Sequence, residues 1–177
     1  MNSLTLFLLS LTLSTLILLF LGIYARRYRH RKAVTAFAIT MLTLVLWSGG
    51  LIFELTSSTL AAKLFWANVQ FLGITFLPLV WLWMTADYTG WGDRLKWPLR
   101  FSAVIPLATN LIIWTNDFHH LFRGQPYLDT ISAPFPVLVN DYGPWFFWVH
   151  VSSGNLLQRA IDLLKGWRVF NKLPEAG

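Results

Sequence analysis

The chain has 177 residues, of which 55% are hydrophobic and 12% are charged, and its mean hydropathy is +0.53. A single soluble core of this size needs far less apolar surface, so the composition predicts an integral membrane protein. The formal net charge of +6 comes from basic residues gathered in particular loops. That pattern indicates membrane topology and argues against nucleic-acid binding. The absence of cysteine excludes disulfides, thiol catalysis and cysteine-bound zinc.

Two uncharged stretches of 21 residues open the chain, at 4–24 and 33–53. As helices, each is long enough to cross about 30 Å of hydrocarbon. A cleaved signal peptide is the alternative for the first stretch. However, no basic residue precedes it and no small-residue cleavage pattern follows it, so we expect an uncleaved anchor. The loop between the two stretches holds five basic residues, which predict a cytoplasmic position: Arg26, Arg27, Arg29, Arg31 and Lys32.

Three further apolar segments follow, at 64–86, at 99–115 and from 145 to 157 or beyond. Pro78 lies inside the third span of the chain and Pro106 inside the fourth. We expect each to kink its helix, because proline lacks a backbone N–H. The fifth segment offers only about 20 Å of helix before polar residues begin, which is short for an untilted span.

Lysine and arginine lie mainly on alternate sides of these segments. The connections after the first and third segments and the end of the chain would lie on one side of the membrane, and they hold most of the basic residues, including Arg94, Lys96 and Arg100. The connections on the other side hold only Lys63 and Arg123. The positive-inside rule therefore places the N-terminus outside. The predicted fold is an all-α integral membrane bundle of four to five transmembrane helices over residues 1–157. A basic amphipathic cytoplasmic tail at 158–177 follows, and the bilayer is the first partner.

Residues 64–150 carry several elements in an order that resembles the N-terminal seven-transmembrane sensor region of bacterial histidine kinases. These elements are Phe71-Leu72-Gly73-Ile74 with Pro78, Ala86-Asp87-Tyr88-Thr89-Gly90, Pro106, Trp114-Thr115-Asn116 with His119-His120-Leu121-Phe122, and Tyr142-Gly143-Pro144 leading to Trp148-Val149-His150. The resemblance implies a multi-pass sensor in the bacterial cytoplasmic membrane. It also implies two more spans and an output domain, so this sequence is expected to hold about five sevenths of the region, without the kinase domain.

No enzyme is predicted, because the sequence lacks Walker A, HExxH and nucleophile-elbow patterns. No cofactor and no metal are predicted either. His119 and His120 are candidate residues of the long loop, but neighbouring side chains point in different directions and seldom share one ion. Histidines solvated at the membrane interface are the simpler interpretation.

Five polar residues form a predicted layer near the outer membrane surface, counted at 1.5 Å per helical residue: Glu54, Asn68, Gln70, Asn110 and His150. Polar side chains inside a membrane are costly and are functional candidates by default. Two interpretations stay open, a ligand pocket and hydrogen bonds that hold the helices together.

The sequence thus predicts a membrane-embedded sensing module that binds an unidentified small molecule on the outer side and acts through a signalling partner protein. Two alternatives remain, a small transporter or channel subunit and a nonfunctional gene fragment.

Overall fold

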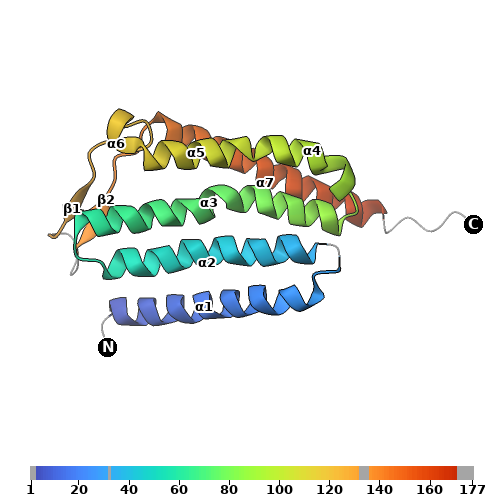
Figure 1. Cartoon of the computed structure of the whole chain (residues 1–177), viewed down its shortest axis with the longest axis horizontal. Helices are drawn as coiled ribbons and strands as arrows, with labels where there is room; N and C mark the ends of the chain where they lie inside the picture. Colours follow the sequence, from blue (N-terminus) through green and yellow to red (C-terminus); the bar gives the residue numbers. More distant parts are fainter. Residues whose placement is uncertain (1–2, 32, 132–135, 171–177) are drawn as a thin grey trace, which may run out of the picture.

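The computed structural model describes residues 3–31, 33–131 and 136–170, and its long helices lie roughly side by side (Figure 1). The first three are α1 (Ser3–Ala25), α2 (Val34–Thr56) and α3 (Leu60–Tyr88), with a short 3₁₀ turn, η1 (Arg26–Tyr28), after α1. Within the described residues, these three helices are long and apolar enough to cross a membrane. Their ends lie within four residues of the predicted ones, because apolar length alone sets them.

The fourth predicted span is divided into α4 (Gly92–Ser102) and α5 (Val104–Trp114), which lie nearly in line (Figure 1). The helical pair begins seven residues before the predicted span at 99, because charged residues end an apolar stretch without ending a helix. The break after Ser102 has a clear cause: Pro106 has no N–H to pair with the Ser102 carbonyl. Pro78 lies buried within an undivided α3, so its kink stays a prediction.

The last helix, α7 (Pro144–Phe170), runs without a break through the predicted boundary between residues 157 and 158. The serines and the glycine after position 151 do not interrupt the helix, because these residues only weaken a helix and do not end it. The tail therefore begins as a continuation of the fifth helix, and its residues 171–177 lie outside the described part of the chain.

The segment between α5 and α7 is ordered by α6 (Asn116–His119) and by two short strands, β1 (Tyr127–Asp129) and β2 (Val137–Val139). The strands are antiparallel, with Leu128 opposite Leu138. No strand was predicted in this segment, because three-residue strands between prolines leave no clear periodicity. We call the end of the bundle with this hairpin and the α2–α3 turn the hairpin end, and the opposite end, with η1 and the α3–α4 turn, the basic end (Figure 1).

α3 is the central helix of the bundle. It packs against α2 on one side and against α4, α5 and α7 on the other (Figure 1). Gly73 brings α3 close to α2, since a Cβ there would collide with the Thr43 carbonyl oxygen. Gly50 does the same from α2, with a Cβ position 2.6 Å from Cγ of Gln70. Small residues at a crossing let two membrane helices pack closely.

Large apolar side chains cover the outer faces of the bundle. Leu13 and Phe20 of α1 are 61% and 64% exposed, and Leu111 of α5 is 67% exposed. None of the residues in the most apolar window of α1 is buried inside the protein. Surfaces of this kind are stable when lipid is the solvent, so the exposure pattern agrees with the composition.

Candidate functional site

The polar residues at the hairpin end begin with a link between the end of α2 and the start of α3. Lys63 is only 1% exposed, and its Nζ donates to the backbone oxygen of Glu54 at 2.7 Å. That carbonyl lies in the last turn of α2, where oxygens lack helical partners and a cation is favoured. The Glu54 carboxylate in turn accepts from Nε2 of Gln70. The structure thus brings Glu54 and Gln70 together.

Asn116, at the start of α6, holds the loop that follows it. Its buried Oδ1 accepts from the backbone N–H of Phe122 at 3.0 Å and of Arg123 at 3.1 Å. Its Nδ2 donates to the Arg123 carbonyl at 2.9 Å. Three bonds from one amide fix the backbone that carries Arg123. Gly143 adds a fourth restraint, since its N–H donates to the Phe122 carbonyl at 2.9 Å.

Arg123 then reaches from the loop into the bundle, where its side chain is 3% exposed. Its Nη2 donates to Oδ1 of Asn68 on α3 at 2.8 Å. Its guanidinium carbon lies 5.9 Å from the centre of the Phe71 ring and 5.5 Å from that of Phe122, within cation–π range. Nε of Arg123 has no hydrogen-bond partner.

Burial lowers the pKa of Arg123 from its ordinary value, and nearby Tyr142, Glu54 and Asp117 act in the opposite direction. Arginine stays a cation throughout the physiological range even so. Glu54 therefore attracts both buried cations of this end, Lys63 and Arg123. We call Glu54, Lys63, Asn68, Gln70 and Arg123 the hairpin-end network; its three charged members sum to +1, from two cations and one carboxylate.

Asn110 lies apart from this network and joins α5 to α3. Its Nδ2 donates to Oγ1 of Thr75 at 2.7 Å and to the Pro106 carbonyl at 2.8 Å, while its Oδ1 has no partner. On the same helix, Oγ1 of Thr109 accepts from Nε1 of Trp145 on α7 at 3.2 Å. These bonds cross between helices, as the structural interpretation of the polar layer expects.

The structure does not bring His150 into this layer. Its side chain is exposed, and its Nδ1 bonds to the carbonyl of Phe146 one turn earlier. Counting residues gave its height along α7 but not the side of the helix on which it lies. His119 accepts from the Leu121 N–H and bonds Thr115, while His120 is exposed at the end of α6. The described residues contain no group of three metal-ligating side chains.

Arg123 and Asn116 are the residues that sequence reasoning missed as site members. Arg123 was counted only as one of two basic residues on the outer side, and a loop residue has no periodicity that would reveal its burial. The available signal was its position directly after Leu121-Phe122, an apolar pair within a polar loop.

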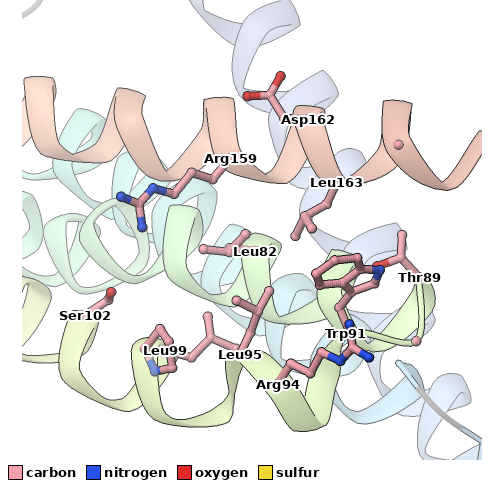
Figure 2. Close-up of a pocket in the computed structure, with 13 residues that line it drawn as sticks. Leu82, Thr89, Trp91, Arg94, Leu95, Leu99, Ser102, Arg159, Asp162 and Leu163 are labelled. Carbon is pink, nitrogen blue, oxygen red and sulfur yellow. The ribbon is translucent and has the colours of Figure 1, made fainter.

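The residues predicted to set topology gather at the basic end, and those described are exposed: Arg26, Arg27, Arg29, Arg31, Arg94 and Lys96. Lys32 lies outside the described residues. A cavity of about 800 Å³ opens at this end between α3, α4 and α7, with Leu82, Leu99 and Leu163 toward its middle (Figure 2).

Residues 10–160 match the family model of the N-terminal seven-transmembrane region of histidine kinases. The chain belongs to this family. The match covers most of the sequence and confirms the resemblance predicted from it. This region of histidine kinases is a non-catalytic module. No curated protein and no solved structure matches the chain closely enough to add a second comparison.

Proposed function

We propose that the chain is a multi-pass sensor module of the bacterial cytoplasmic membrane, with its hairpin end outside and its basic end toward the cytoplasm. The distribution of cations supports this orientation. Within the described residues, the hairpin end carries Lys63 and Arg123, and both are buried in the protein. The basic end presents its arginines and lysines to the surroundings, as the cytoplasmic face of a membrane protein does.

The proposed topology has five crossings. In addition to α1, α2 and α3, the aligned pair α4–α5 covers residues 92–114, and α7 covers 27 residues. At 1.5 Å per residue these helices are about 34 Å and 40 Å long, enough for a hydrocarbon core of about 30 Å. Both pack against α3, which is long and apolar enough to cross a membrane.

The proposed sensing element is the hairpin-end network. The observation that carries this proposal is the buried Arg123, which ties an external loop to the central helix through Asn68. A stimulus that displaces the loop must also break or move this bond. Because α3 contacts α2, α4, α5 and α7, a change in its position alters packing throughout the bundle. Packed interfaces switch between discrete arrangements, so the change reaches the basic end.

The proposed stimulus is a small molecule at the hairpin end that binds one packing better than another. The proposed output is a signalling partner protein at the basic end, reached through α7. We propose no nucleic-acid partner, because membrane topology accounts for the basic charge. We also propose no enzymatic activity.

A chimera tests this proposal without a known ligand. Residues 1–170 are fused to a histidine kinase output domain, and autophosphorylation is measured in membrane vesicles. Arg123→Met cuts the link between loop and α3 and should change the autophosphorylation rate at least about threefold. Arg100→Met is the matched control, because Arg100 also lies over an aromatic ring, that of Trp97, but is exposed and outside the network. Equal rates in wild type, variant and control would contradict the proposal.

A further inference from the structure

In the membrane orientation proposed above, on which this inference rests, the cavity at the basic end lies where the hydrocarbon of a bilayer meets its polar surface. It extends from Leu82, five residues and about 7 Å before Asp87, to Thr89, Gly90 and Trp91, beyond the end of α3. Its volume of about 800 Å³ is within the range of sites that hold small molecules, about 300 to 1,000 Å³. α4 and α7 form its two walls (Figure 2).

The walls combine an apolar middle with charged ends. Leu95 and Leu99 of α4 and Leu163 of α7 line the middle (Figure 2). Arg94 lies at one end, with its guanidinium carbon 5.2 Å from the centre of the Trp91 ring, and Arg159 lies at the other. This arrangement offers separate surfaces to an acyl chain and to an anionic group.

The positive charge of the cavity is only partly compensated. Asp162 also lines it, so the three charged groups sum to +1, from two arginines and one aspartate. The Asp162 carboxylate accepts from Nε2 of Gln158 at 3.0 Å. A guanidinium at the edge of the hydrocarbon needs an anionic partner, and lipid phosphate is the one that a membrane supplies.

We propose that this cavity binds an anionic phospholipid, whose phosphate is attracted by Arg94 and Arg159 and whose acyl chains contact the leucines of the middle. Arginine suits this role, because its planar fork donates two parallel hydrogen bonds to phosphate. Trp91, 44% exposed beside Arg94, is the amphipathic residue favoured at headgroup depth. The lipid would join α4 to α7, the two walls of the cavity.

Native mass spectrometry of the purified full chain in detergent tests this proposal. The delipidated protein receives equal amounts of dioleoyl phosphatidylglycerol and dioleoyl phosphatidylcholine, and the first bound lipid is counted. We expect the anionic lipid to be preferred at least about fivefold. Arg94→Gln and Arg159→Gln should each weaken its binding by about fivefold to tenfold, a tenfold change being about 1.4 kcal/mol. Arg100→Gln, on the same helix but outside the cavity, should bind as the wild type does.

Three results would overturn the proposal: equal retention of both lipids by the wild type, equal losses in all three variants, or displacement of the lipid by millimolar inorganic phosphate. The last would assign the cavity to a soluble anion. The comparison of the two lipids on the wild type requires no substitution, so the test holds even if Arg159→Gln does not fold. Circular dichroism of each variant confirms its helical content.

Discussion

Replacing Arg123 by methionine tests the energetic importance of the link between the loop and α3. Methionine keeps an unbranched apolar stem of similar length but removes the charge and all donors. The Asn68 carbonyl then loses the hydrogen bond of 2.8 Å, and the Phe71 and Phe122 rings lose their cation. A hydrogen bond to a charged group contributes about 1.5 to 3 kcal/mol, and a cation–π contact about 0.5 to 2 kcal/mol.

Removing the buried charge also relieves its desolvation, so we expect a net loss of about 2 to 3 kcal/mol in the free energy of unfolding. For a chain of this size that corresponds to a thermal midpoint about 4 to 12 °C lower. The assay is thermal unfolding in detergent followed by circular dichroism. Arg123→Lys should restore little, because a lysine lacks the planar fork. A midpoint for Arg123→Met equal to that of the exposed control Arg100→Met would refute the reasoning.

Three further substitutions probe the packing and the charges. Gly73→Ala should lower the thermal midpoint measurably, because the new Cβ would collide with the backbone of α2. Gly49→Ala is the control, since a Cβ there meets open space and should leave the midpoint unchanged. Equal midpoints for the two variants would contradict the close α2–α3 crossing. Glu54→Gln should destabilise the bundle by about 1 to 2 kcal/mol in the same assay, because both buried cations lose the carboxylate that attracts them; an unchanged midpoint would show that this attraction is negligible. Asn110→Leu should cost only about 0.6 kcal/mol, the average for hydrogen bonds between membrane helices, and loss of the folded protein would show a larger role.

Much of the fold could be predicted because the length of each apolar stretch along the sequence is enough to locate a membrane helix. Apolar length located α1, α2 and α3, and basic residues marked one end of the bundle. The same reasoning gives no helix bounds where charged and apolar residues mix. α4 begins at Gly92, seven residues before the apolar stretch, because a helix can include Arg94 and Lys96.

The candidate site was harder to predict, because height along a helix does not determine which way a side chain points. Gln70 and His150 were placed at similar depth, yet Gln70 faces α2 and His150 faces outward. The burial of Arg123 depends on a loop that Asn116 folds through three hydrogen bonds. Contacts of this kind join residues of distinct segments, and no local pattern in the sequence records them.

The central claim is that the chain threads the membrane with its hairpin end outside, and a cysteine-labelling experiment tests it most directly. The chain contains no cysteine, so single substitutions give an unambiguous signal. A membrane-impermeant maleimide applied to intact cells should label Ile131→Cys, since Ile131 is 94% exposed at the hairpin end, and should label Arg29→Cys only after the cells are opened. The proposed orientation would be contradicted if Arg29→Cys were labelled in intact cells while Ile131→Cys was protected. The membrane assignment itself would be contradicted if the chain were recovered in the soluble fraction without detergent.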